Sequence, residues 1–241
     1  MIASDQPTIF GKEIIAAVSS VSDGNMKFGI ENDDVLKNRQ VFLENLGIDL
    51  KNTTLVTIDY SPAANYTQYR TLNDSEKAGG MFAPDSETIA DALVVTKPGH
   101  ALFLPLADCV GVILHDAVKG VLMVSHVGRH SAEVDGAKKS VHYLMDSFAS
   151  RPADIRAWLS PAVGKASYPV HALGDKGLHE IIVEQLLGAG LRQENIEVSA
   201  VDTARDKNYF SHSEYLAGNR DSKGRFAVVA MMMGEQGEPA A

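Results

Sequence analysis

Apolar residues along this chain recur in short runs that favour strands, and longer stretches with helical periodicity separate them. Eight runs are rich in β-branched or other apolar residues and are bounded by polar or turn residues. They lie at 12–19, 53–58, 91–96, 100–106, 109–115, 121–126, 196–201 and 225–231. We therefore expect an extensive β-structure.

Three stretches between these runs place their apolar residues on one helical face. The stretches are 33–46, 131–149 and 176–187. Asp175 is placed to cap the start of the last one, while Gly47 and Gly188 are placed to end the first and the last. Helices and strands mix without strict βαβ alternation, which indicates an α/β or α+β fold with mixed sheets in a single domain spanning 1–241.

The stretch ADCVGVILHDAVKGVLMVSH, residues 107–126, predicts an antiparallel hairpin. With a turn over 116–119, Cys109 lies directly opposite His126, and their Cβ atoms are roughly 5 Å apart on one face of the sheet. A slip by one residue would separate them, and loops of nearby length also fit. His115 lies on the same face as Cys109 but roughly 20 Å from it along the strand. We therefore expect His115 to be an exposed residue near the turn.

A thiol and an imidazole at this separation can bind one metal ion or interact with each other. The alternative is that the lone cysteine is a small buried apolar residue and the histidine an ordinary polar group. Asp108 and the polar segment 125–131 favour a functional pair. Arg129 and His130 begin a predicted helix, where free amides and the helix dipole favour an anion, although a solvated loop is the alternative.

Composition restricts the partners and the compartment. The chain has 241 residues and a formal net charge of −9, and no block of Lys and Arg relieves that charge. A nucleic-acid or anionic-membrane partner is therefore not expected. The single cysteine cannot form an internal disulfide, which suits a reducing compartment. We expect a cytoplasmic protein, monomeric or homodimeric, that acts on small molecules.

Several segments are similar, in order and spacing, to those of one known family. DALVVT (91–96), LADCVGVILHD (106–116) and SHVGRHS (125–131) resemble the hallmark of the YfiH-like, laccase-domain family. Its members are called polyphenol oxidases, peptidoglycan-editing factors or purine nucleoside phosphorylases. LSPAVGKASYPV (159–170) and YFSHSEYLAGNRDSKGRFAVV (209–229) resemble further family segments.

The resemblance implies a four-layer α/β/β/α fold and a zinc site held by two histidines and one cysteine. Cys109 and His126 match two of these ligands. A site with an open fourth position can activate water or polarise a substrate. The implied activity is zinc-dependent phosphorolysis of purine nucleosides, or deamination of adenosine. We place Asp108 and Arg129 beside the pair as further candidate catalytic residues.

The matching family segments also suggest which residues contact a nucleoside and phosphate. The candidate substrate-binding residues are His130, Phe210, His212, Arg220 and Arg225. His212 is in addition a candidate third metal ligand. The copper chemistry suggested by the name polyphenol oxidase would need several sites rich in His and Cys, and the chain has one Cys and eight His.

The chain departs from the family where the first zinc ligand is expected. The corresponding region, 54–69, has no histidine, and Asp59 or Tyr60 occupies the place. Other functions therefore stay open. One is a metal-free cysteine hydrolase or deamidase with Cys109 as the nucleophile and His126 as its base. Another is a protein that binds a metabolite without catalysis.

Overall fold

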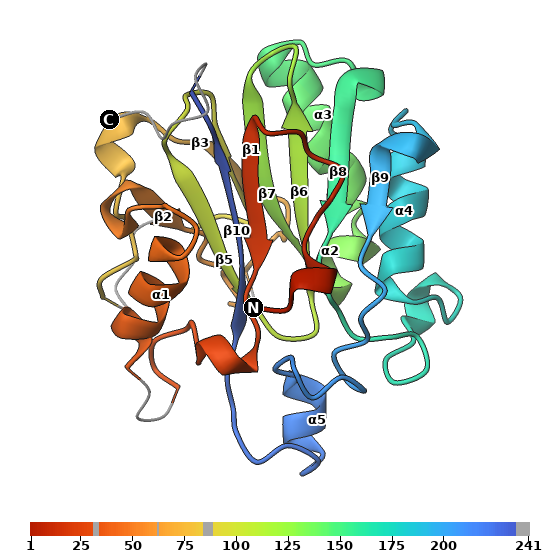
Figure 1. The fold of residues 1–241 in the computed structure, drawn as a ribbon. Helices are drawn as coiled ribbons and strands as arrows, with labels where there is room; N and C mark the ends of the chain where they lie inside the picture. Colours follow the sequence, from red (N-terminus) through yellow and green to blue (C-terminus); the bar gives the residue numbers. More distant parts are fainter. Residues whose placement is uncertain (31–33, 62, 84–88, 235–241) are drawn as a thin grey trace.

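The computed structural model describes residues 1–30, 34–61, 63–83 and 89–234 (Figure 1). Its strands are β1 (Ile14–Val18), β2 (Thr53–Leu55), β3 (Tyr69–Thr71), β4 (Ala92–Val95), β5 (Ala101–Leu106), β6 (Val110–Asp116), β7 (Val121–Val127), β8 (Ile155–Leu159), β9 (Ile196–Val198) and β10 (Phe226–Met232). They form two sheets with the orders β1-β10-β5-β2 and β3-β4-β7-β6-β8-β9. Each sheet has parallel and antiparallel pairs, so the expectation of mixed sheets is confirmed.

Helices cover the outer faces of both sheets. The α-helices are α1 (Val35–Glu44), α2 (Arg129–Glu133), α3 (Gly136–Phe148), α4 (Leu178–Gly188) and α5 (His212–Leu216). Short 3₁₀ helices lie at Ala3–Asp5, Val21–Asp23, Leu50–Asn52, Asp74–Glu76, Pro152–Asp154, His171–Leu173 and Gln193–Asn195. In Figure 1, α1 lies outside the four-stranded sheet, and α3 and α4 lie outside the six-stranded one. This is the expected α/β/β/α arrangement.

Three apolar layers hold these elements together. Phe42 of α1 packs with Phe103 of β5, and Val141 of α3 packs with Val112 of β6. Between the sheets lies the third layer, which includes Ile113 of β6. Strands β6 and β7 are buried along their whole length because both of their faces are covered. This explains why the sequence there is continuously apolar instead of alternating.

One end of the two sheets collects the ends of several strands. Strand β5 ends where β10 begins, since Leu106 pairs with Phe226, and the connection 107–109 leads directly into β6. Strand β7 ends at the same place and is followed by α2 (Figure 1). Residues with reactive or charged side chains from distant parts of the sequence therefore lie close together at this end.

Several helix boundaries differ from the expected ones. The stretch 131–149 is divided because Asp135 adopts a left-handed backbone conformation, with φ of 61°, between α2 and α3. Helix α4 begins after Gly177, whose amide donates to the Glu180 carboxylate, so Asp175 is not its cap. Helix α1 is shorter than 33–46, and position 33 lies outside the described residues.

Strand boundaries also differ. Strands β3 and β8 were not predicted, because a three-residue strand carries little periodic signal and Arg156 interrupts the apolar run of β8. The run 196–201 forms a strand only as far as Val198. His115 is 3% exposed, so the expectation of a surface residue is wrong. The N-terminal segment covers it, and the Phe10 ring contacts its imidazole edge-on at 6.4 Å.

Candidate functional site

The sulfur of Cys109 and the imidazole of His126 lie on the same face of the hairpin, but they are not directly opposed. His126 pairs with Gly111, because the turn begins one residue later than expected and Asp116 pairs with Val121. This shifts the pairing by two residues, which places the pair diagonally on one face of the sheet. The expected direct opposition is therefore wrong, and the expected shared face is confirmed.

Gly128 makes room for this pair. A Cβ atom built on Gly128 would lie 2.9 Å from the Cys109 sulfur and 3.6 Å from Nε2 of His126. Any side chain there would displace one of the two groups. Gly128 is also the N-cap residue of α2, so the site and the start of that helix share one residue.

His126 is a buried imidazole without hydrogen-bond partners. It is 3% exposed, and neither ring nitrogen has a partner among the described residues. Burial and the nearby charge of Lys27 lower its pKa to about 4. At neutral pH the ring is therefore uncharged, with one nitrogen as donor and the other as acceptor. The Tyr60 ring contacts it edge-on at 6.1 Å.

Cys109 is a neutral thiol in this environment. Burial and the charge of Asp108 raise its pKa to about 12, against the opposing effect of Arg225. A thiol whose pKa is raised in this way is protonated at pH 7. The thiol is therefore a weak donor and acceptor rather than a prepared nucleophile.

Asp108 holds the start of β6 against the segments that follow β9. Its backbone has φ of 78°, a left-handed conformation that Asp tolerates better than most residues. Its carboxylate accepts from the Thr203 hydroxyl at 2.8 Å and from the Ser213 amide at 2.7 Å. The carboxylate is outside the lining of the adjoining pocket. Asp108 therefore joins the turn before Cys109 to α5, and it does not line the pocket.

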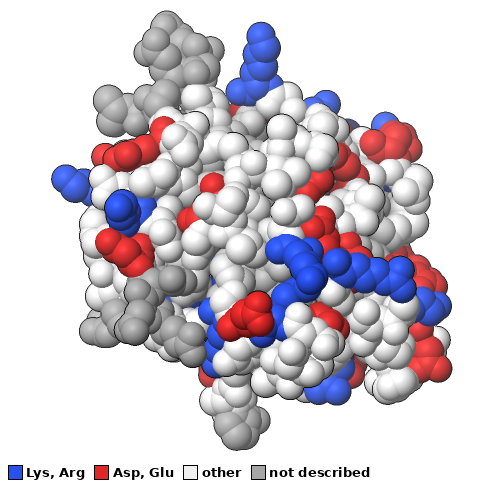
Figure 2. All heavy atoms as spheres, turned by 60° about the horizontal axis from the view of Figure 1, so that its bottom comes forward, with Lys and Arg blue, Asp and Glu red and all other residues white. Residues whose placement is uncertain are grey.

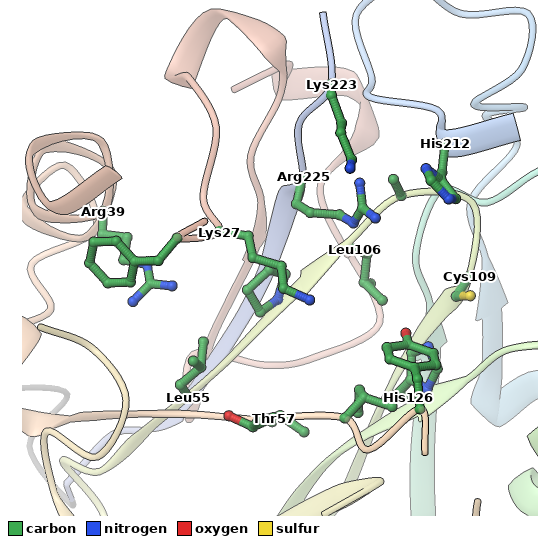
Figure 3. Close-up of a pocket in the computed structure, with 16 residues that line it drawn as sticks. Lys27, Arg39, Leu55, Thr57, Leu106, Cys109, His126, His212, Lys223 and Arg225 are labelled. Carbon is green, nitrogen blue, oxygen red and sulfur yellow. The ribbon is translucent and has the colours of Figure 1, made fainter. Parts of the chain in front are cut away.

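Cys109 and His126 line a pocket of about 490 Å³ that opens at this end of the sheets (Figure 3). Its described lining includes four cationic side chains and no Asp or Glu. The cationic residues are Lys27, Arg39, Lys223 and Arg225. In Figure 3, Arg225 points between Lys223 and Lys27, and His212 approaches from the same side as Lys223. The remaining lining is mainly apolar, from Phe28, Leu55, Val56, Ile58, Pro105, Leu106 and Ala107.

Three of these cations have no acidic partner in the described part of the chain. Lys27, Lys223 and Arg225 make no ion pair there, and Arg225 only donates to its neighbour's carbonyl. Burial and the charges of Arg225 and Lys223 lower the pKa of Lys27. Arg39 differs, because its guanidinium is fully buried, donates to the carbonyls of Met26, Gly80 and Met81, and lies over the Phe28 ring.

The sequence-predicted substrate residues divide into two groups. His212 and Arg225 line the pocket. Phe210 packs against Gly224, Arg220 donates to three main-chain carbonyls, and both lie outside this lining. His130 is outside it as well, stacked on Tyr66 at a ring distance of 4.9 Å.

Arg129 also lies outside the pocket. It begins α2 as expected, but it is exposed and lies 4.0 Å from the Glu133 carboxylate. Arg129 and His130, which were expected to bind an anion at the start of α2, therefore do not line the pocket. The cations that line the pocket instead include Lys27 and Lys223, which sequence reasoning missed. Lys223 lies two residues before Arg225, and this spacing was a signal that could have pointed to it. No sequence feature singled out Lys27.

The donor set is incomplete for the zinc site that the sequence implied. Within the described ranges, no group of three His, Cys, Asp or Glu side chains is arranged to hold a metal ion. Of the two candidates for the first ligand, Asp59 is engaged by the Ser61 amide and hydroxyl, whereas Tyr60 lines the pocket. His212 also lines it and has a buried Nδ1 without a partner.

The face around the pocket carries charges of both signs. Figure 2 turns this end of the molecule toward the viewer, and on that face basic and acidic side chains are interspersed. No broad basic surface of the kind that binds nucleic acid is visible there. None of the described helices is long and apolar enough to cross a membrane.

Comparisons with known proteins support this fold and identify the family of the chain. The family model described as multi-copper polyphenol oxidoreductase laccase matches residues 18–176. The crystal structure of YlmD from Geobacillus stearothermophilus superposes with a TM-score of 0.84 at 20% identity, covering 97% of this chain and 98% of that one. The hypothetical protein YfiH of Bacillus licheniformis gives 0.78 at 23% identity, covering 91% and 92%.

Curated relatives carry an enzyme name. The purine nucleoside phosphorylase YlmD of Bacillus subtilis is 23% identical over 83% of this chain and 84% of its own. A purine nucleoside phosphorylase of Mycobacterium bovis is 31% identical over 59% of this chain and 62% of its own. One from Corynebacterium glutamicum is 38% identical over 33% of this chain and 32% of its own. The last two matches thus span less than two thirds of those relatives.

Proposed function

Since this chain belongs to the multi-copper polyphenol oxidoreductase laccase family, we propose that it is a purine nucleoside phosphorylase acting in the pocket beside Cys109 and His126. One observation carries the proposal. A neutral, unpartnered imidazole lies in the same pocket as several cations, and no carboxylate lines that pocket among the described residues. The neutral imidazole suits a nucleoside, and the cations suit phosphate. The name of the relatives supports this choice.

The cationic side of the pocket binds the attacking phosphate. Lys27 and Arg225 provide charged N–H donors, which form short and strong hydrogen bonds with phosphate oxygens. The absence of an acid from the described lining keeps these donors free for the anion. The phosphate is held as a nucleophile in a partly desolvated site, where fixed charges act more strongly than in water.

The Cys109 side of the pocket binds the nucleoside. In the reaction, a phosphate oxygen forms a bond to ribose C1′ while the C1′–N9 bond breaks and leaves its electron pair on the purine. The purine takes up one proton, which solvent supplies. His126 is neutral at pH 7, so it orients the base or the ribose through one donor and one acceptor nitrogen and does not supply the proton.

Zinc has no step in this proposal, because the described residues provide two converging donors, Cys109 and His126, where catalytic zinc sites use three. Deamination of adenosine, which needs an activated water, loses its support for the same reason. The cysteine-hydrolase alternative loses support too, because it needs a thiolate and burial raises the pKa of the Cys109 thiol.

The test measures release of free purine from inosine, guanosine and adenosine with and without inorganic phosphate. We expect release to depend on phosphate. His126→Asn and Arg225→Gln are each expected to lower kcat/KM at least 100-fold. The matched control is His171→Asn, because His171 is 83% exposed and remote from the pocket lining. Binding of nucleoside without any release of purine would favour the metabolite-binding alternative and refute the enzyme.

Metal analysis of the same purified protein tests separately whether the reaction depends on zinc. Because two donors hold zinc weakly, we expect well below one zinc per chain and unchanged phosphorolysis after treatment with a chelator. Stoichiometric zinc that is lost in Cys109→Ala would contradict this expectation. It would show that a third donor, with His212 the nearest candidate in the lining, completes the site.

A further inference from the structure

The pocket carries more positive charge than one phosphate ion neutralises. Lys27, Lys223, Arg225 and the buried Arg39 contribute four formal charges to its lining. Inorganic phosphate at pH 7 is a mixture of monoanion and dianion and brings at most about two negative charges. Because no Asp or Glu belongs to the described lining, roughly two positive charges stay uncompensated after phosphate binds. The chain as a whole has a net charge of −9, so the charge of this lining is opposite in sign to that of the whole chain.

The excess of positive charge in the pocket lowers the stability of the folded protein. Some Arg and Lys side chains of the described chain form ion pairs with carboxylates, as Lys176 does with Glu184. Lys27, Lys223 and Arg225 form none, and the charges of Lys223 and Arg225 act on Lys27. Like charges held together in a partly desolvated pocket destabilise the folded protein unless an anion joins them. Three cations without ion pairs around one cavity, whose described lining has no carboxylate, therefore favour a polyanionic ligand.

The cations also reach the pocket from different directions. Lys27 follows the 3₁₀ helix Val21–Asp23, whereas Lys223 and Arg225 precede β10. In Figure 3, Lys223 lies on the side of His212, and Lys27 lies toward the centre of the cavity. His212 adds a buried Nδ1 that has no partner. The arrangement offers two anion positions that share Arg225, and a volume of about 490 Å³ lies within the usual range for small-ligand sites.

We propose that the substrate carries its own phosphate and is a purine nucleoside 5′-monophosphate. Lys223, with Arg225 and beside His212, binds the 5′-phosphate, and Lys27, with Arg225, binds the inorganic phosphate. This inference rests on the proposed phosphorolysis. An oxygen of inorganic phosphate bonds to C1′, the C1′–N9 bond breaks, and the purine keeps the electron pair and takes a proton from solvent. The products are the free purine and ribose 1,5-bisphosphate.

The experiment compares inosine 5′-monophosphate with inosine at fixed phosphate and fixed ionic strength. The readout is the ratio of their kcat/KM values, and we expect at least tenfold preference for the monophosphate. Lys223→Gln is expected to reduce this ratio to near one. Lys119→Gln, in the exposed turn at the opposite end of the sheets, is expected to leave it unchanged. A ratio at or below one in the native protein overturns the inference.

Failure of the inference and failure of the proposed function give different results. Phosphorolysis of inosine without preference for the monophosphate refutes the inference alone. Without turnover of either compound the proposed function fails, and calorimetric titration with each compound then tests the second anion position. Binding of the monophosphate at least tenfold tighter than inosine, lost in Lys223→Gln, supports the position. Equal affinities, or inorganic phosphate alone binding as tightly as the monophosphate, overturn it.

Discussion

Gly128 shows how a single residue controls the separation of two functional groups. The Cys109 sulfur and the His126 imidazole lie on the same strand face, two positions apart in register, and both lie against the place where a Cβ of residue 128 would be. The φ of Gly128 is −95°, which any residue can adopt. The glycine is therefore needed for space and not for its backbone freedom.

Replacing Gly128 by Ala tests this point. The new Cβ would lie 2.9 Å from the sulfur, so the thiol or the imidazole must move, and we expect kcat/KM to fall at least tenfold. Urea unfolding should show a loss of about 1–3 kcal/mol, because the added methyl overpacks this site.

Gly188→Ala is the control for this change. It ends α4 with no atom within 4 Å of its added Cβ, and it should leave activity unchanged. Full activity of Gly128→Ala would mean that the positions of the two groups are not critical.

At the scale of elements, the connection between β5 and β6 organises the site. Asp108 turns the chain through a left-handed conformation, and its carboxylate joins this turn to Thr203 and to the start of α5 at Ser213. The same helix carries His212 into the pocket lining. One buried side chain thus connects this turn with two segments that lie 95 and 105 residues later in the sequence.

Asp108→Asn should loosen this connection. Asn tolerates the left-handed backbone, and its carbonyl can still accept from Thr203, but its NH₂ group cannot accept from the Ser213 amide. Leaving that amide unpaired is expected to cost about 1–3 kcal/mol of unfolding free energy, measured in urea.

The control is Asp175→Asn at another left-handed position, which is exposed and should change stability by less than about 0.5 kcal/mol. Equal effects of the two substitutions would refute the positioning role of Asp108.

At the scale of the whole molecule, buried histidines couple stability to pH. Burial lowers the pKa of five of them: His100, His115, His126, His179 and His212. Such groups are neutral when folded and gain a proton on unfolding in mild acid. Stability is therefore complete above the unfolded pKa near 6.5 and falls as the pH drops toward the folded pKa.

His100 gives the clearest case. It is 2% exposed, and burial lowers its pKa to about 4. Because the Thr54 hydroxyl donates to the Glu76 carbonyl, the His100 ring donates to the Thr54 oxygen. Between pH 6.5 and 4 this group alone should remove on the order of 3 kcal/mol of unfolding free energy. His100→Gln keeps a donor for Thr54 and should flatten this part of the curve, as measured by urea unfolding at several pH values. His142→Gln on α3 should retain the full slope, and an unchanged slope in His100→Gln would contradict this account.

Much of the fold was predictable from local patterns. The apolar runs of β5, β6, β7 and β10 are long and nearly free of polar residues, and burial on two faces is the physical reason. Strands β3 and β8 were not predictable, because they are short or interrupted and are recognised only when paired with neighbours. The shared face of Cys109 and His126 was predictable because a strand has a period of two, which a shift by two residues preserves.

The sequence by itself determined the mixed α/β class, the central hairpin and the face on which its thiol and imidazole lie, because these depend on periodicity over a few residues. Only the tertiary structure decided the register of that hairpin, since turns of similar length are nearly equal in local energy. It also decided that Lys27 and Lys223 join Arg225 in one pocket while Arg129, His130, Phe210 and Arg220 stay outside. Those contacts join segments up to about 200 residues apart, and no local pattern encodes which distant side chains share a cavity.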